Sequence, residues 1–495
     1  MLLVCFACAA LAHAAGIKLQ PVSLPKGAVT AGTKALPVNV SGDSKKELVL
    51  VEGQTMSILR LEGDKYVPQQ KLTLPSARDS AGKTYYGFGR LDLKAPYSIL
   101  LLQPDGIYYY PLEGGMISDQ PRILLKKPLI QGQASDREPQ YFDFALDLDN
   151  DGLDDLLLPE ARGFSIYHQT APRQFSPVRL PRDPYKQTDT FNFQRLLPDD
   201  RSRVPSISGY MSRRSGVNNL LLFDANSDGL EDLIYTTTLP GPNSKEIDRY
   251  DIFLQRRDCE FTTQPSQSMA VPYEHNADVT FRDLNRDGRL DAIVIKSNLD
   301  IVNPKTQVKF YMAGKDSSQI FARESDRFVT KDPIGIVCVA DFNNDRYIDF
   351  AVTYFSYQFS SVDDIVDFVL SNKLRFRLQF FLGRGSAGFN RQPDYQKELQ
   401  LSMKTESYRG YPPIMITDDM NGDKIMDLVV RTEEDKLAVY PSSGNFSYEK
   451  DPSDQLTIPE DAVVNFDDVN ADGLTDIIIS SIAKPQVTVY LSTPK

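Results

Sequence analysis

The sequence predicts an all-β fold, a β-propeller of four-stranded antiparallel blades. Three observations lead to this prediction. One acidic loop recurs six times along the 495 residues, with intervals of 77, 59, 58, 78 and 49 residues. Each copy follows and precedes short apolar or alternating runs, which are typical of strands. The intervals have room for four short strands each, and a repeat of this length is the signature of a propeller blade.

The recurring loop places a carboxylate or carboxamide at its first, third, fifth and ninth positions. The six sets are Asp147, Asp149, Asp151, Asp155; Asp224, Asn226, Asp228, Asp232; Asp283, Asn285, Asp287, Asp291; Asp341, Asn343, Asp345, Asp349; Asp419, Asn421, Asp423, Asp427; and Asp468, Asn470, Asp472, Asp476. A single cluster of this kind is equally typical of a polar turn. Six copies with identical offsets favour a repeated function over six chance turns.

The spacing suits calcium, which binds roughly six to eight oxygens in loops that alternate acidic side chains with a backbone carbonyl. The seventh position would supply that carbonyl, from Leu153, Leu230, Arg289, Tyr347, Ile425 and Leu474. Thiols and imidazoles are absent from the loops, which argues against zinc. The formal net charge is −12, a charge that six Ca²⁺ ions would neutralise. We therefore expect up to six Ca²⁺ ions.

The sixth position of the loop is glycine in four copies, where a sharp turn is needed. Arg346 and Lys424 replace it in the other two, which leaves calcium binding at those two sites open. The loop is not an EF-hand, because that motif needs a glutamate at position twelve and flanking helices. Position twelve is apolar here, as at Leu158, and strands flank the loop.

Two degenerate copies extend the repeat toward the N-terminus. The first keeps Asn39, Ser41, Asp43 and Glu47, whereas the second, around Asp92, keeps almost no ligands. Counting both predicts eight blades, and merging them would give seven. The last repeat lacks a fourth strand, and residues 17–25 resemble the fourth strands of other repeats. We expect this N-terminal segment to complete the eighth blade and close the ring, which removes open sheet edges.

Two insertions interrupt the repeat, at 182–217 and 355–373. In an antiparallel blade both would emerge on the face opposite the calcium loops, because they follow a fourth and a second strand. The first mixes basic and aromatic side chains, which on a rigid scaffold favour either ligand binding or simple docking onto the propeller. The second, SSVDDIVDFVLSNK, has apolar residues at helical spacing and predicts a short helix on the rim.

Residues 1–15 form an apolar run that ends in a pattern suited to signal-peptide cleavage, although a positive n-region is missing. We expect residues 16–495 to form one propeller domain located outside the cytoplasm: secreted, periplasmic or at the cell surface. Weak calcium sites fill readily there. A pI near 5.0 gives no basic face for nucleic acid. No further stretch is apolar enough to span a bilayer. We expect the propeller to be a monomer.

The loops and the Asp-Leu-Val-like strands that follow them resemble the FG-GAP and VCBS-type repeats of integrin α-subunits and of bacterial surface or secreted proteins. Phe88-Gly89 and Gly163-Phe164 match the Phe-Gly element that names the family, while the Gly-Ala-Pro part is largely absent. The resemblance covers nearly the whole mature chain and is closer to the bacterial VCBS-type subset. It implies a calcium-binding role for the six ligand sets.

Three classes of function follow. The leading hypothesis is a protein- or carbohydrate-binding adhesion module with structural calcium and its ligand on the face opposite the loops. A calcium-dependent polysaccharide lyase or hydrolase is the alternative, although no catalytic residue can be named from the sequence. The two histidines of the mature chain, His168 and His275, lie in no catalytic motif. A structural subunit of an extracytoplasmic assembly is the third possibility.

Overall fold

A computed structural model describes most of the chain. The described residues are 16–42, 44–75, 84–127, 138–160, 163–181, 193–195, 220–226, 228–240, 246–272, 277–287, 291–298, 305–312, 326–330, 334–355, 373–385, 388–402, 414–443 and 446–495. The elements formed by these residues are strands, so the all-β prediction is confirmed. No helix with the length and apolarity needed to cross a membrane occurs in these ranges.

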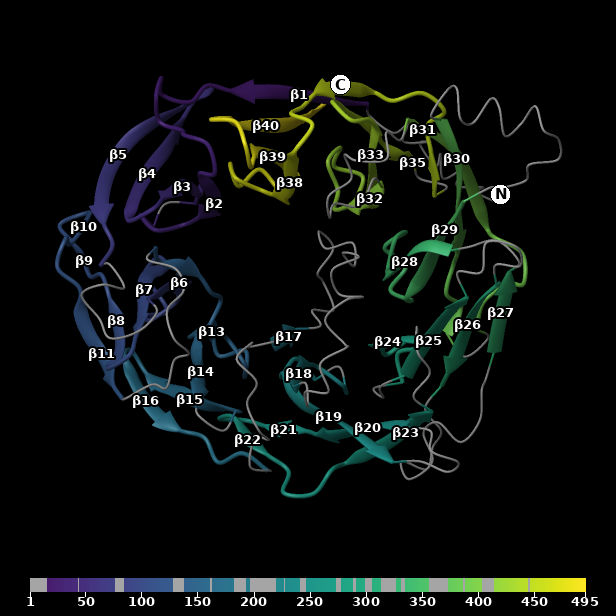
Figure 1. Cartoon of the computed structure of the whole chain (residues 1–495), viewed down its shortest axis with the longest axis horizontal. Helices are drawn as coiled ribbons and strands as arrows, with labels where there is room; N and C mark the ends of the chain where they lie inside the picture. Colours follow the sequence, from purple (N-terminus) through teal and green to yellow (C-terminus); the bar gives the residue numbers. More distant parts are fainter. Residues whose placement is uncertain are drawn as a thin grey trace, which may run out of the picture.

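The strands form eight blade sheets arranged in a ring, and Figure 1 shows the ring down its axis. The chain passes from the inner strand of each blade to the outer one and then enters the next blade. Eight blades are therefore confirmed, and the seven-bladed alternative is wrong. The two N-terminal repeats do not merge, because each has its own sheet.

Among the first four blades, the second and the fourth have a fifth strand. Blade one consists of β2 (Lys34–Val38), β3 (Glu47–Glu52), β4 (Thr55–Glu62) and β5 (Lys65–Thr73). Blade two consists of β6 (Tyr85–Gly89), β7 (Ser98–Gln103), β8 (Gly106–Tyr109) and β11 (Arg122–Lys126), with β12 (Gln140–Tyr141) added. Blade three consists of β13 (Ala145–Leu146), β14 (Asp155–Glu160), β15 (Gly163–Ala171) and β16 (Gln174–Pro177). Blade four consists of β18 (Leu220–Phe223), β19 (Asp232–Pro240), β20 (Glu246–Phe253) and β23 (Gln267–Pro272), with β17 (Phe193–Arg195) added.

The last four blades are regular four-stranded sheets. Blade five consists of β24 (Ala277–Arg282), β25 (Asp291–Asn298), β26 (Lys305–Tyr311) and β27 (Asp326–Thr330). Blade six consists of β28 (Ile334–Ala340), β29 (Asp349–Phe355), β30 (Lys373–Phe381) and β31 (Tyr395–Ser402). Blade seven consists of β32 (Ile414–Thr417), β33 (Asp427–Glu433), β34 (Lys436–Tyr440) and β37 (Asp454–Thr457). Blade eight consists of β38 (Ala462–Asp467), β39 (Asp476–Ser481), β40 (Val487–Pro494) and β1 (Ile17–Val22).

The N-terminal strand closes the ring, as predicted. β1 pairs antiparallel with β40, with Ile17 opposite Pro494 and Val22 opposite Val489, so blade eight combines both ends of the described chain (Figure 1). Its inward side chains pack into clusters shared with blades seven and one. Closing the ring in this way leaves β40 without a free edge.

Two features of the sheets were not predicted. β12 and β17 add a fifth, parallel strand to the inner strands of blades two and four. Three blades also carry a two-stranded hairpin between their third and fourth strands. These hairpins are β9 (Leu112–Glu113) with β10 (Met116–Ile117), β21 (Gln255–Arg256) with β22 (Glu260–Phe261), and β35 (Ser442–Ser443) with β36 (Ser447–Tyr448). They emerge on the same face as the acidic loops.

The hydrophobic core lies between neighbouring blades. Leu378 of blade six and Val430 of blade seven belong to one buried cluster, and similar clusters join the other blades. The second strand of a blade is buried on both faces, as in β7, where Ile99 to Leu102 are at most 1% exposed. This burial explains why second strands have continuous apolar runs in the sequence.

Several sequence predictions fall outside the described residues. They include the signal peptide at 1–15, the helix predicted within 355–373 and His275. Of the first insertion, only Phe193–Arg195 is described, as β17. The insertion therefore contributes a short strand to the inner edge of blade four. Ligand binding by its basic and aromatic side chains stays a prediction.

Lys397 on β31 provides a test of the blade six and seven interface. Its side chain lies over the Tyr440 ring at 4.2 Å and donates a hydrogen bond to the Glu449 carbonyl, and the residue is 6% exposed. Burial lowers the pKa of Lys397 to about 8. The unfolded chain then binds more protons between about pH 8 and pH 10.5, so this lysine makes stability rise with pH there. Lys397→Met is expected to be more stable than wild type at pH 7, and the difference should shrink as pH increases from 8 to 10. Urea unfolding at several pH values measures it, and a constant difference would contradict the assignment.

Candidate metal centres

The acidic loops share one hydrogen-bonded conformation. In the first loop the N–H groups of Asp151 and Gly152 donate to the Asp147 carboxylate at 3.1 and 3.0 Å. The same two bonds recur at Asp224, Asp341 and Asp468. Each loop therefore curls around its first carboxylate. The sequence spacing predicts that the ligand positions converge, and in these four loops the backbone bonds to the first carboxylate.

The ninth-position aspartates are buried and connect three strands of a blade. Each accepts a hydrogen bond from the second-position N–H of its own loop, at 2.7–3.1 Å. In five blades the other carboxylate oxygen accepts an N–H from a residue within the third strand or just after it. The five donors are Gln169, Gln255, Gly383, Ser442 and Ser492. The ninth aspartate therefore has a structural role besides any metal ligation.

Burial makes four of these carboxylates costly to ionise without a cation. It raises the pKa of Asp232 and Asp349 to about 8, and that of Asp427 and Asp476 to about 7. The first and fifth aspartates of the same loops add to this effect through their negative charge. A bound divalent cation would favour the ionised form of every carboxylate in the set.

The backbone at positions four and six is left-handed. Gly152, Gly229 and Gly473 at position six have φ of 87° to 89°. Arg346 and Lys424 adopt the same region, with φ of 79° and 67°. The two copies without glycine therefore keep the loop conformation, and the substitution costs backbone strain rather than the turn itself.

Replacing these two residues tests that strain. Arg346→Gly and Lys424→Gly are each expected to stabilise the protein by about 1 kcal/mol, because glycine adopts positive φ without a Cβ clash. Arg346→Ala and Lys424→Ala remove the same charge but keep the strain, so they serve as matched controls. Chemical unfolding in chelator measures the effect on backbone strain, and unfolding in calcium adds any effect on metal binding. Equal stability of the glycine and alanine variants would contradict a backbone origin.

The first loop differs from the others because its third position is Asp149 rather than asparagine. In the other five copies the asparagine amide donates to the fifth carboxylate. Asp149 has no proton to donate, and its side chain is only 5% exposed. One of its carboxylate oxygens, Oδ1, is buried without a hydrogen-bond partner. Carboxylate oxygens of Asp147, Asp149 and Asp151 lie within 4.8 Å of one another, a spacing that fits one cation.

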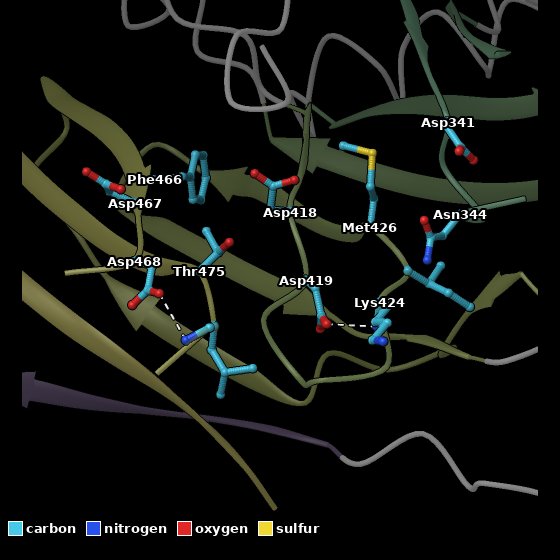
Figure 2. A pocket seen from close by; sticks show the side chains of 13 residues that line it. Asp341, Asn344, Asp418, Asp419, Lys424, Met426, Phe466, Asp467, Asp468 and Thr475 are labelled. Carbon is cyan, nitrogen blue, oxygen red and sulfur yellow. Dashed lines mark hydrogen bonds between the residues drawn. The ribbon is translucent and has the colours of Figure 1, made fainter. Parts of the chain in front are cut away.

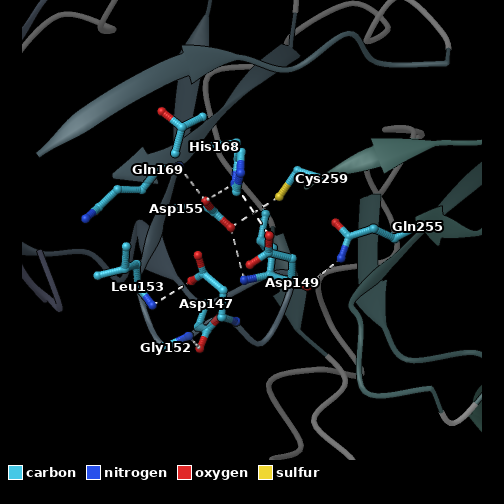
Figure 3. A network of polar contacts seen from close by, with 12 residues as sticks. Asp147, Asp149, Gly152, Leu153, Asp155, His168, Gln169, Gln255 and Cys259 are labelled. Atoms are coloured by element: carbon cyan, nitrogen blue, oxygen red, sulfur yellow. Dashed lines mark hydrogen bonds and ion pairs between the residues drawn. The ribbon is translucent and has the colours of Figure 1, made fainter. Parts of the chain in front are cut away.

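A histidine and a cysteine also reach this loop, a contact that was not predicted from the sequence. His168 Nδ1 on β15 lies 3.0 Å from Asp155 Oδ1 and 3.7 Å from Asp149 Oδ2 (Figure 3). Cys259, from the hairpin of blade four, places its thiol 3.3 Å from Asp155 Oδ2. His168 is thus a buried side chain within the loop network, rather than an isolated strand residue. Burial, followed by the charge of Asp155, raises the pKa of the Cys259 thiol. A buried thiol with a raised pKa is a poor nucleophile.

The two degenerate loops lack the ligand set. In blade one, Glu47 takes the place of the ninth aspartate and accepts hydrogen bonds from Val40 and Ser41. In blade two, Arg90 occupies the first position, and its guanidinium lies over the Tyr97 ring at 5.1 Å. A fixed positive charge there disfavours a cation, as expected for this copy. Asp43 lies outside the described residues, as do Gly288 and Arg289 of the third full loop.

Backbone hydrogen bonds connect neighbouring loops around the ring. The N–H at the eighth position of one loop donates to a carbonyl at the start of the preceding loop. The five described pairs are Asp154 to Arg90, Glu231 to Leu148, Met426 to Phe342, Thr475 to Asp419, and Lys46 to Val469. The last pair joins blade one to blade eight, next to an ion pair between Lys46 and Asp467 at 2.5 Å. The loop face is therefore a connected belt rather than a set of separate turns.

A cavity of about 580 Å³ opens between the loops of blades six, seven and eight (Figure 2). Carboxylates from all three loops line it, including Asp341, Asp419 and Asp468. Met426 and Phe466 add apolar surface. Its volume is in the range of small-ligand sites, so the loop face also offers room for a ligand.

Comparisons with known proteins leave the family open. No protein-family model and no curated protein matches the chain. Among solved structures, a lectin from Agrocybe aegerita, described as recognising non-reducing terminal N-acetylglucosamine, aligns with a TM-score of 0.42 and 12% identity, covering 94% of this chain and 99% of that one. The Tc holotoxin pore of Photorhabdus luminescens aligns with a TM-score of 0.27 and 11% identity, covering 93% and 24%. Similarities this low do not transfer a ligand. The strand order of its own sheets shows that the chain is an eight-bladed β-propeller.

Proposed function

We propose that the chain is a secreted or surface-located calcium-binding propeller that binds a protein or carbohydrate partner, with calcium in a structural role. The repeated loop geometry carries the proposal. Carboxylates recur at matching positions in six loops, and in the first loop oxygens of Asp147, Asp149 and Asp151 lie within 4.8 Å of one another. Asp149 Oδ1 is buried without a hydrogen-bond partner. Oxygen-only sets of this kind suit calcium better than softer metals.

The residues would hold calcium through the first, third and fifth side chains and the seventh carbonyl of each loop. A carboxylate oxygen that accepts one backbone amide still has a second lone pair, so the ninth carboxylates of the fourth, fifth and sixth loops could also contribute to binding. In the fifth loop the fifth side chain and the seventh carbonyl lie around one hydroxyl group. Ser442 Oγ lies within 3.3 Å of both Asp423 oxygens and 3.5 Å from the Ile425 carbonyl. A bound ion would tie the strands of a blade together without changing the fold.

Native mass spectrometry of the folded chain in millimolar calcium tests the metal part directly. We expect several Ca²⁺ ions per chain, up to six. Asp472→Ala in the sixth loop should remove one ion, whereas Asp92→Ala in the degenerate loop of blade two should remove none. A chain that carries no calcium under these conditions would refute the proposal.

The partner part needs a separate experiment, because two surfaces compete. The first insertion favours the face opposite the calcium loops, whereas the described cavity lies on the loop face. Screening of a glycan array and of extracellular protein fractions should be done with three variants: deletion of residues 182–217, Phe466→Ala in the cavity, and Asn465→Ala, an exposed neighbour on the same strand. Loss of binding in only one of the first two variants identifies the surface. A chain that binds nothing on either screen contradicts a binding module.

A further inference from the structure

A second kind of metal cluster lies at the boundary between blades three and four. Asp149, His168 and Cys259 place one ligand atom each within 4.8 Å of one another, and Figure 3 shows the three side chains pointing toward one another. His168 is 8% exposed, Cys259 is fully buried, and the Asp149 side chain is 5% exposed. The three residues come from a loop, a strand and the hairpin of the next blade, so the fold has to bring them together.

The other loops of the same chain show what is particular to this one. Their third position is asparagine, which satisfies the fifth carboxylate with its own amide. Asp149 has no such bond, and its Oδ1 atom is buried without a partner. A buried carboxylate oxygen in this state requires a cation or a donor.

The histidine is equally particular to blade three. It precedes the residue whose N–H binds the ninth aspartate, and in four other blades the same place holds an apolar residue: Leu254, Leu382, Pro441 and Leu491. An imidazole at this point reaches into the loop, but it requires the burial of a polar side chain. The other blades show that the fold itself does not require it.

The cysteine is held in place by strained backbone. Cys259 has φ of 54° at the turn of the blade four hairpin, and Phe446 has φ of 50° at the matching place of the blade seven hairpin. Phe446 uses this position to stack on Phe342 of the preceding blade, with ring centroids 6.3 Å apart. Cys259 uses it to place a thiol beside Asp155 of the preceding blade. A positive φ for a residue other than glycine is uncommon, and here it directs sulfur into the cluster.

We propose that Asp149, His168 and Cys259 bind a zinc-class transition-metal ion, with Asp155 as the fourth ligand. Asp155 Oδ1 lies 3.0 Å from His168 Nδ1, and the other oxygen, Oδ2, lies 3.3 Å from Cys259 Sγ. Asp149 Oδ2 lies 3.7 Å from the same nitrogen. The edges of a tetrahedron with zinc bonds of about 2.0 to 2.3 Å are about 3.3 to 3.8 Å long. Sulfur and nitrogen ligands favour zinc over calcium, whereas the Asp147 side of the loop keeps only oxygens.

Binding replaces protons that hold the metal-free cluster together. Without an ion, the Cys259 thiol lies within hydrogen-bond distance of Asp155 Oδ2, and His168 Nδ1 lies within hydrogen-bond distance of Asp155 Oδ1. The ion displaces the thiol proton to solvent and requires the imidazole tautomer that carries its proton on Nε2. Asp149 has two carboxylate oxygens, so it can serve this ion and a calcium ion in the loop at the same time.

Cobalt provides the direct test, because Co²⁺ reports thiolate ligation and tetrahedral geometry by absorption. The full chain, freed of metal by chelator and dialysed, is titrated with Co²⁺ with and without millimolar calcium, and Zn²⁺ is then added as competitor. We expect one Co²⁺ per chain with a sulfur-to-cobalt charge-transfer band, bleached by Zn²⁺. Cys259→Ser should abolish the band, and His168→Gln should weaken zinc binding by more than the roughly 10- to 100-fold that an outer-shell partner is worth.

Two further variants keep the test independent of folding. Asp149→Asn introduces the residue that the other five loops carry, so it should fold normally, retain calcium and lose affinity for Co²⁺. Cys338→Ser removes the other described cysteine, which lies in a hydrophobic cluster, and should leave the band intact. The proposal is refuted by a wild-type chain that shows no charge-transfer band in either buffer, or by a band that survives Cys259→Ser. Zinc binding unchanged in folded Asp149→Asn removes that residue from the site and also counts against it.

Discussion

Removal of calcium is expected to lower the melting temperature of the propeller by about 15 °C. At about 10 mM Ca²⁺ and dissociation constants of about 10⁻⁴ M, each filled site stabilises the folded state by about 2.7 kcal/mol. The chain has 495 residues, and an unfolding entropy of about 2.1 cal/mol/K per residue converts six such sites into a shift of this size. Differential scanning calorimetry in calcium and in excess chelator measures it.

The control for this experiment is magnesium at the same ionic strength. Mg²⁺ is smaller, demands octahedral geometry and gives up its water reluctantly, so it should restore only part of the loss. Asp472→Ala should reduce the calcium-dependent shift by about one sixth of its total, if the six sites are equal and independent. Identical melting curves with and without chelator would contradict a structural role for calcium.

The second large effect is expected at the strand that closes the ring. Ile17 and Leu19 on β1 are 0% and 6% exposed and pack between blades seven and eight. Replacing both with alanine removes buried aliphatic surface, at a cost of about 2 to 5 kcal/mol each. Detachment of β1 would also expose the edge of β40, so we expect aggregation on heating besides a lower free energy of unfolding.

The neighbouring residues of the same strand provide the matched control. Lys18 and Gln20 alternate with Ile17 and Leu19 and are exposed. Lys18→Ala with Gln20→Ala should change stability by no more than about 0.5 kcal/mol per residue. Urea unfolding and light scattering compare the two double variants. If both double variants lose the same stability, or if neither loses any, β1 does not close the ring through its buried face.

The propeller was predictable from the sequence because its signals are local and repeated. The loop spacing, the apolar second strands and the missing fourth strand of the last repeat all lie within a blade. Pairing of β1 with β40 followed from counting strands, although the two segments are separated by almost the whole chain. The described loops curl around their first carboxylate, while the ligand sets and calcium itself stay predictions.

Contacts between blades were not predictable in the same way. Cys259 belongs to blade four and meets Asp155 of blade three only through the hairpin, which has no strong sequence signal. β12 and β17 pair parallel to inner strands across long connections, and short segments of this kind show no periodicity. Comparison of the repeats offered one usable signal. Asp149 is the single aspartate at a position that is otherwise asparagine, and His168 stands where other blades have leucine or proline.

The backbone bonds between successive loops make the propeller behave as a hoop. Each of the five described amides at the eighth position depends on two blades at once, so it is released to solvent only when neighbouring blades separate. Deuterium uptake at Glu231, Met426 and Thr475 should consequently occur together and at the slow rate of global opening, even though these turns lie near the surface. A break at the seam between Lys46 and Val469 would relax the circumference and accelerate exchange in distant blades as well.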